Sequence, residues 1–202
     1  PVPAVPGIAS PHFPPGAVAE ELGEFLVRAS LAAAVDHLQL DQRIPLSRMF
    51  NEYFGGSMGS PVFQELREAQ GLAYAAFAYY GTPDKPTEHD YFYAYIGTQA
   101  DKQPEAMSAM QKLLMDFPKS EGGFEIARNG ILNQIESERI TKANILFNYE
   151  SARKKGVTYD LRKDVYDKTQ KFTLNDVTAF QQQYVKGKNF NVVLIGSKDK
   201  IN

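Results

Sequence analysis

The chain has 202 residues, a length that suits one large domain or two small ones. Its 43% hydrophobic and 23% charged residues are ordinary for a folded globular protein, and 22 basic against 24 acidic side chains leave a net charge of -2. This balance argues against attraction to nucleic acid or an anionic membrane through overall charge. No apolar run approaches the roughly 20 residues that span a bilayer. The absence of cysteine excludes disulfides, thiol catalysis and cysteine–zinc sites.

The beginning of the chain carries the weakest structural signals. Residues 1–16 hold six of the twelve prolines and predict an extended arm or linker, followed by one domain over residues 17–202. Residues 17–28 fit an amphipathic helix, whereas the residues around His37 alternate between apolar and polar, so the type of element stays open there. The chain begins with proline rather than methionine, which indicates a processed product or a fragment of a longer protein.

Two helices are predicted next, separated by a glycine-rich loop. Apolar residues recur at helical spacing and stop at Gly55 and Gly56, which predicts that the first helix ends there. Ser60 followed by Pro61 predicts the start of a second helix, which ends at Gly71. The residues expected to face inward in these helices are Leu46, Met49, Phe50, Tyr53, Phe54, Val62, Phe63 and Leu66.

The rest of the chain predicts strands followed by helices. Residues 72–80 and 91–98 are rich in aromatic residues and predict an antiparallel pair of strands. Five helices and a terminal strand follow, and this mixture with neighbouring strands indicates the α+β class. The predicted helices cover residues 104–115 (with Ala106, Met110, Leu113 and Leu114 inward), 124–139, 143–155, 160–169 (capped by Asp160) and 173–187 (opened by Thr173 and Asp176), and the strand covers residues 190–195.

Arg67 and Tyr74 are the residues with the clearest chemical potential. They lie seven positions apart across the helix–strand junction, where a chain reversal at Gly71 would bring a permanent cation and a phenol donor toward one point. Such a pair suits stabilisation of a developing oxyanion, because neither group must change its protonation state. A structural explanation is also open, since Arg favours a helix C-terminus and a strand Tyr is usually half-buried packing. Spacing alone favours the structural explanation.

The segment around these residues resembles the C-terminal, zinc-free domain of M16 metallopeptidases, the pitrilysin and mitochondrial-processing-peptidase-like family. In that family a loop of the form F-G-G-G-M-x-S leads into a helix reading F-Q-E-L-R-E-x-x-G-L-A-Y. Here residues 54–60 read F-G-G-S-M-G-S, residues 63–68 read F-Q-E-L-R-E and residues 71–74 read G-L-A-Y. Ser57 replaces the third glycine. The resemblance extends over residues 45–196.

The resemblance implies a LuxS/MPP-like metallohydrolase fold, an antiparallel sheet packed with helices. It implies that Arg67 and Tyr74 contact the substrate carbonyl near a zinc ion held by the other half of the enzyme. It also implies that a loop lines the peptide-binding chamber and that the chain is inactive alone. The loop residues that would bind substrate are Gly55, Gly56, Ser57 and Met58.

The zinc-binding motif of the family is missing from this sequence. The zinc half carries an inverted H-x-x-E-H, in which two His bind zinc and Glu activates water. His12, His37 and His89 do not have that spacing, and a metal site at Glu88, His89 and Asp90 is disfavoured because adjacent loop residues rarely converge on one ion.

We therefore expect no metal or cofactor in this chain. The resemblance implies zinc in an H-x-x-E-H-bearing M16 domain, either in the same polypeptide or in a partner subunit, and an extended peptide as substrate. It slightly favours the bacterial periplasm. An alternative stays open, in which the chain is a catalytically inert M16-like binding or scaffold subunit.

Overall fold

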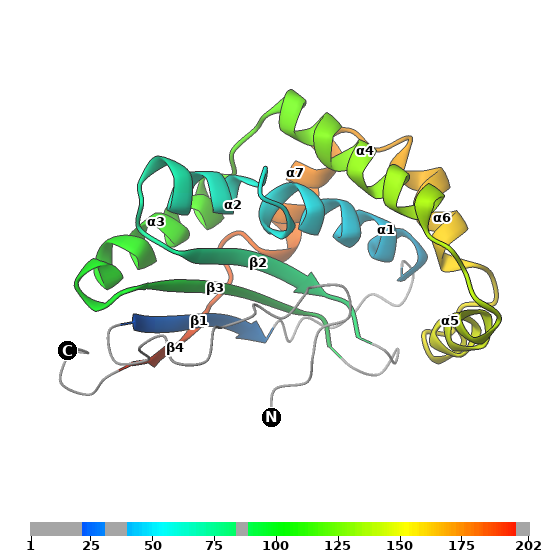
Figure 1. The fold of residues 1–202 in the computed structure, drawn as a ribbon, viewed down its shortest axis with the longest axis horizontal. Helices are drawn as coiled ribbons and strands as arrows, with labels where there is room; N and C mark the ends of the chain where they lie inside the picture. The colour runs from blue at the N-terminus through cyan, green and yellow to red at the C-terminus, as the bar shows by residue number, and fades with distance from the viewer. Residues whose placement is uncertain (1–21, 31–39, 84–88, 197–202) are drawn as a thin grey trace.

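The computed structural model describes residues 22–30, 40–83 and 89–196. The predicted arm over residues 1–16 lies outside these residues. Four strands form one antiparallel sheet in the order β2-β3-β1-β4. The strands are β1 (Leu22–Ser30), β2 (Ala75–Gly81), β3 (Tyr91–Gln99) and β4 (Asn191–Ile195), shown in Figure 1.

Strand β1 corrects one prediction. Its backbone pairs with β3 along its whole length, from Leu22 opposite Gln99 to Ser30 opposite Tyr91. Its other edge pairs with β4. The expectation of a helix over residues 17–28 is therefore wrong from Leu22 onward. Pairing on both edges is a long-range effect, and it overrides the weak helical periodicity of this segment.

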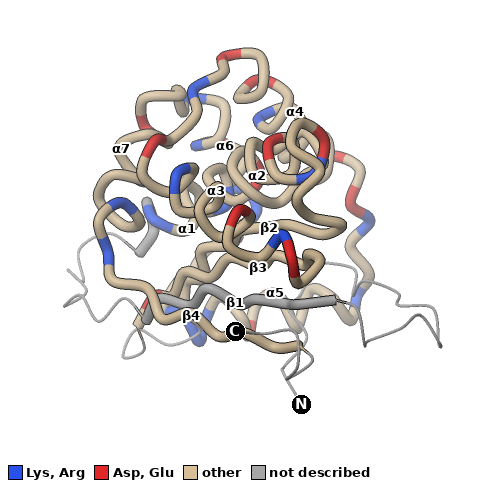
Figure 2. The backbone as a smooth tube through the Cα atoms, turned by 90° about the vertical axis from the view of Figure 1, so that its left-hand side faces the viewer, with Lys and Arg blue, Asp and Glu red and all other residues tan. Residues whose placement is uncertain are grey.

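Helices cover one face of this sheet (Figures 1 and 2). The exception is α5, which stands off beside the sheet. Two short π-helical segments, η2 and η3, border the glycine-rich loop, and η4 is a 3₁₀ turn. The bounds are α1 (Leu40–Asn51), η2 (Glu52–Gly56), α2 (Pro61–Phe63), η3 (Gln64–Ala69), η4 (Ala100–Lys102), α3 (Gln103–Met115), α4 (Glu121–Ser137), α5 (Lys142–Lys154), α6 (Leu161–Thr169) and α7 (Leu174–Tyr184).

The three helix starts predicted from capping residues are confirmed by their contacts. The Ser60 hydroxyl accepts a hydrogen bond from the Phe63 amide, and Asp160 caps α6 through the Arg162 amide. Thr173 and Asp176 form a reciprocal capping box at the start of α7. Helix α1 begins at Leu40 and contains Pro45 in its interior.

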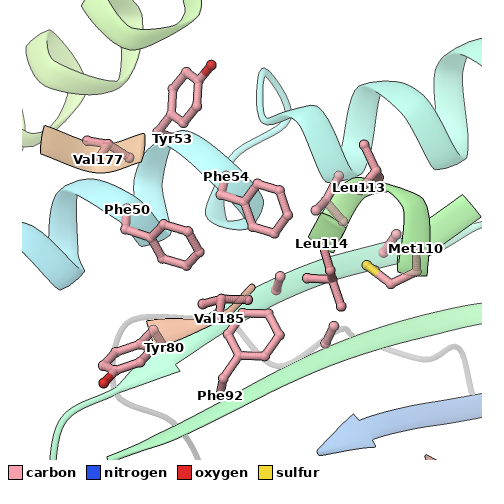
Figure 3. Close-up of a cluster of buried hydrophobic side chains, with 14 of the residues drawn as sticks. Phe50, Tyr53, Phe54, Tyr80, Phe92, Met110, Leu113, Leu114, Val177 and Val185 are labelled. Atoms are coloured by element: carbon pink, nitrogen blue, oxygen red, sulfur yellow. The ribbon is translucent and has the colours of Figure 1, made fainter. Parts of the chain in front are cut away.

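The hydrophobic core lies between the helical layer and the strands β2 and β3 (Figure 3). Phe50 is fully buried and lies 5.3 Å from Phe54 and 5.2 Å from Phe180, measured between ring centroids. The predicted inward residues of α3 are all buried. Of the eight predicted inward residues before the sheet, Leu46 and Phe63 are only partly buried. The α+β class is therefore confirmed, with a helix-rich fold around a small antiparallel sheet.

A buried ion pair joins α1 to the residue directly before β3. The Arg43 guanidinium is 3.0 Å from the Asp90 carboxylate, and the Tyr80 hydroxyl donates to the same carboxylate oxygen at 2.6 Å. Burial, reinforced by this hydrogen bond, raises the pKa of Tyr80 far above its usual range. Asp90 is 4% exposed, so its carboxylate is committed to Arg43 and Tyr80 rather than to a metal ion.

Candidate functional site

The glycine-rich loop turns one residue inward and the others outward. Gly55 is buried against β2, where an added Cβ atom would lie 2.4 Å from the Ala78 backbone nitrogen. Gly56 is exposed, Ser57 is partly exposed and Met58 is 74% exposed. The Gln64 amide donates to the Met58 carbonyl at 2.7 Å, which ties the loop to η3. The loop therefore offers Gly56, Ser57 and Met58 to a ligand, while Gly55 sets its position on the sheet.

Replacing Gly55 with alanine should destabilise the domain by about 1–3 kcal/mol, the usual cost of overpacking a tight contact. The clash is with the backbone of Ala78, which cannot rotate away as a side chain can. Urea denaturation would measure the change in the free energy of unfolding. Gly122→Ala is the matched control, because nothing lies within 4 Å of its added Cβ. Equal stability of the Gly55 and Gly122 variants would contradict the expected clash.

The predicted chain reversal after η3 is confirmed. Gly71 has a φ of +58°, in the left-handed region that favours glycine. The Leu66 carbonyl then accepts hydrogen bonds from the amides of Leu72 at 2.9 Å and Ala73 at 3.1 Å. These bonds fold the chain back on η3, which is why β2 begins at Ala75 rather than at residue 72. Arg67 directly follows Leu66 and Tyr74 directly follows Ala73, so the Ala73–Leu66 hydrogen bond lies beside both residues.

Arg67 is held by local contacts while its charge stays accessible. Its guanidinium carbon lies 4.9 Å from the centre of the Phe63 ring, a cation–π contact. Its Nε atom is 3.8 Å from a Glu68 carboxylate oxygen, and 47% of the side chain is exposed. An exposed pair of this kind contributes little to stability. The side chain is therefore oriented yet able to meet a ligand.

Tyr74 is positioned by the sheet. Its amide donates to the Gly97 carbonyl at 2.9 Å, and its ring lies on Gly97, where an added Cβ would be 2.4 Å from Cζ. Its hydroxyl is 3.4 Å from the Tyr95 hydroxyl. The structure shows why a glycine is needed at position 97, since any side chain would displace the Tyr74 ring.

More than half of the chain matches a single protein family. Residues 4–130 match the model described as the peptidase M16 inactive domain. This chain belongs to that family. No curated protein sequence matches this M16 domain.

Solved structures share the fold of this M16 domain at low sequence identity. A peptidase M16 inactive domain from Pseudomonas fluorescens has a TM-score of 0.71 and 14% identity, covering 89% of this chain and 42% of its own. The inactive peptidase domain of a protein assigned as a zinc protease, from Bordetella parapertussis, has a TM-score of 0.67 and 16% identity, covering 88% and 94%. The periplasmic protease PqqL from Escherichia coli has a TM-score of 0.63 and 15% identity, covering 89% and 19%. The M16 domain thus spans less than half of the Pseudomonas and Escherichia chains.

The described part of this M16 domain does not fit a zinc ion. Among residues 22–30, 40–83 and 89–196, no three His, Asp or Glu side chains gather as a metal site would require. The sequence has no cysteine and no H-x-x-E-H. Within the same residues, no helix is long and apolar enough to cross a lipid bilayer.

Proposed function

We propose that this M16 domain is the zinc-free half of a zinc metallopeptidase, which holds substrate peptide and stabilises the transition state through Arg67 and Tyr74. The reversal at Gly71 carries this proposal, because it ties the backbone beside Arg67 to the backbone beside Tyr74. Both side chains remain more than a third exposed. The zinc would belong to an H-x-x-E-H-bearing M16 domain, in the same polypeptide or in a partner subunit.

The chemistry of the pair suits an oxyanion. Arginine supplies a permanent charge with fixed donors, and tyrosine supplies one hydroxyl donor, so neither group changes protonation during the reaction. Phe63 and Gly97 hold these two side chains before substrate arrives. Preorganised donors of this kind act most strongly when the closed assembly excludes water.

The accessible part of the loop completes the proposed site. Gly56, Ser57 and Met58 would contact the peptide, with Gly55 supporting them from the sheet. The proposed place of action is the bacterial periplasm, which is supported by the similarity to a periplasmic protease.

A second candidate function is an inert binding or scaffold subunit. The contacts of Arg67 with Phe63 and of Tyr74 with Gly97 favour it, because they give both residues a structural role without any substrate. An H-x-x-E-H sequence upstream in the parent chain, or in an adjacent gene, would favour the peptidase half. Its absence would favour the scaffold.

The isolated chain should contain no stoichiometric zinc and hydrolyse no peptide, and hydrolysis should begin when a zinc-bearing M16 partner is added. Metal analysis and cleavage of a fluorogenic peptide would measure this. The control is a partner whose H-x-x-E-H glutamate is replaced by glutamine, which should stay inactive in the mixture. Tightly bound zinc in the isolated chain would overturn the assignment. Equal hydrolysis by the partner with and without this chain would favour the scaffold.

A further inference from the structure

The sheet face turned away from the helices carries a row of aromatic rings. Strands β2 and β3 alternate between fully buried residues, which join the core, and half-buried residues on the opposite face. We call the aromatic residues of that opposite face the tyrosine face. Its members are Tyr74, Phe77, Tyr79, Tyr91, Tyr93 and Tyr95.

The rings of the tyrosine face hold one another in place. Phe77 lies opposite Tyr95 in the register, with ring centroids 5.1 Å apart. Tyr79 lies opposite Tyr93 at 5.6 Å, and Tyr91 stacks on Tyr93 at 6.1 Å. These separations fall within the range of favourable aromatic pairs. The surface is therefore rigid, and little side-chain entropy remains to be lost when a ligand binds.

The rings of the tyrosine face carry no formal charge, while the adjacent strand β1 places Arg28 opposite Tyr93 and Glu24 opposite Gly97 in the register. Strands β2 and β3 contain no Asp, Glu, Lys or Arg, so both are tan throughout Figure 2. Burial, together with the neighbouring Tyr91 and Tyr79, raises the pKa of Tyr93 to about 12, so that this phenol is neutral at physiological pH. A ligand over β2 and β3 therefore meets aromatic rings, which pack best against apolar side chains.

The tyrosine face is continuous with the proposed catalytic pair. The Tyr74 and Tyr95 hydroxyls are 3.4 Å apart. Tyr93 and Tyr91 precede Tyr95 at alternate positions of β3, so they extend the row of rings away from Tyr74. Residues on one face of a strand recur about every 6.6 Å, and an extended peptide has the same period. Such a peptide would present one side chain to each successive ring.

We propose that the tyrosine face is a substrate subsite that binds an extended peptide segment with aromatic or aliphatic side chains at alternate positions. The segment would flank the peptide bond held at Arg67 and Tyr74, so the inference rests on the proposed function. Tyrosine provides a large contact area at low entropic cost and is common among the residues that dominate binding energy.

Binding to the isolated chain tests this inference with fluorescein-labelled eight-residue peptides. One peptide has Phe at alternate positions with Ser between, a second has Ser throughout, and a third has Glu in place of each Phe. Fluorescence anisotropy should show the Phe peptide binding about tenfold or more tightly than the other two, a difference that one or two ring contacts can supply. Equal or tighter binding of the Ser peptide or of the Glu peptide would overturn the proposal.

Variants locate the binding on the tyrosine face. Tyr93→Ala should weaken the Phe peptide about tenfold, and Tyr93→Phe should retain most of the affinity because the ring remains. Tyr149→Ala is the matched control, since Tyr149 is 61% exposed on α5. Circular dichroism would check folding, and Tyr91→Ala provides a second test if Tyr93→Ala unfolds. Unchanged binding in the folded variants, or equal loss in Tyr149→Ala, would reject the subsite.

The same variants separate this inference from the proposed function. With a zinc-bearing partner, Tyr93→Ala should raise KM about tenfold and leave kcat within about twofold, because the subsite contributes binding rather than chemistry. If the chain binds the Phe peptide selectively but Arg67→Ala leaves kcat unchanged, the subsite is supported and the catalytic role is rejected. If Arg67→Ala lowers kcat but the chain does not prefer the Phe peptide, only the subsite is rejected.

Discussion

Arg67→Ala and Tyr74→Phe should each lower kcat about 100- to 1,000-fold in the assembly of this M16 domain with a zinc-bearing partner, the usual loss of one oxyanion donor. KM should change little, because the donors act on charge that develops only in the transition state. Steady-state hydrolysis of a fluorogenic peptide would measure both constants. Arg153→Ala is a matched control, since Arg153 is also an exposed helical arginine paired with a nearby glutamate.

Gly97→Ala gives an independent approach to the same prediction. The added methyl group would displace the Tyr74 ring, which can swing away because it is the end of a side chain. We expect kcat to fall toward that of Tyr74→Phe while the domain stays folded. If Arg67→Ala and Tyr74→Phe both keep kcat within about threefold of the unsubstituted chain, the oxyanion role is wrong.

Arg43→Met should destabilise the domain by about 3–5 kcal/mol, because it leaves a buried carboxylate without its cation. Asp90 is 4% exposed, and Tyr80 would remain as its hydrogen-bond donor. Arg43 Nε and Nη2 and Asp90 Oδ1 already lack hydrogen-bond partners within the described residues, so the pair has little compensation for its burial. Chemical denaturation would measure the loss of unfolding free energy.

The double variant Arg43→Met/Asp90→Leu should recover a large part of that loss, because apolar residues replace both charges. Arg153→Met is the surface control. Arg153 pairs with Glu150 on α5, and an exposed pair of this kind contributes little to stability. If Arg43→Met is no less stable than Arg153→Met, the Asp90 carboxylate does not depend on Arg43 for its burial.

Local signals predicted much of the fold. The helix starts predicted from the capping residues Ser60, Asp160 and Thr173 are confirmed, because capping depends on residues only two or three positions apart. The caps Ser120 and Thr141 were missed, so α4 and α5 begin earlier than predicted. Gly71, predicted to end the second helix, has the positive φ that favours glycine. These features need no knowledge of distant parts of the chain.

Long-range contacts explain what local signals missed. Residues 22–30 form β1 because β3 and β4 pair with both of its edges, and neither partner is near in sequence. Arg43 and Asp90 gave no sign of their ion pair, since they lie on separate elements. The strand alternation was visible, but the rings of the tyrosine face become one surface only when β2 and β3 pair.

The candidate site was predictable in part. The glycine at position 71 predicted the reversal that ties the chain beside Arg67 to the chain beside Tyr74, and the structure confirms this backbone arrangement. The inward packing of Gly55 was not predictable, because it depends on the close approach of Ala78. The roles of Arg67, Tyr74 and the loop residues in substrate binding stay predictions.

Helix α5 shares little with the rest of the fold. Of its 13 residues only Ala152 is buried, while Ile145, Phe147 and Tyr149 are each more than half exposed. A lone helix of this length is marginally stable in water, and local unfolding is least costly where few apolar contacts are lost. Helix α5 can therefore melt while the core persists. Among the helices that the structure describes, α5 is where a protease would cut first, and α6 and α7 would remain bound to α1 after the cut.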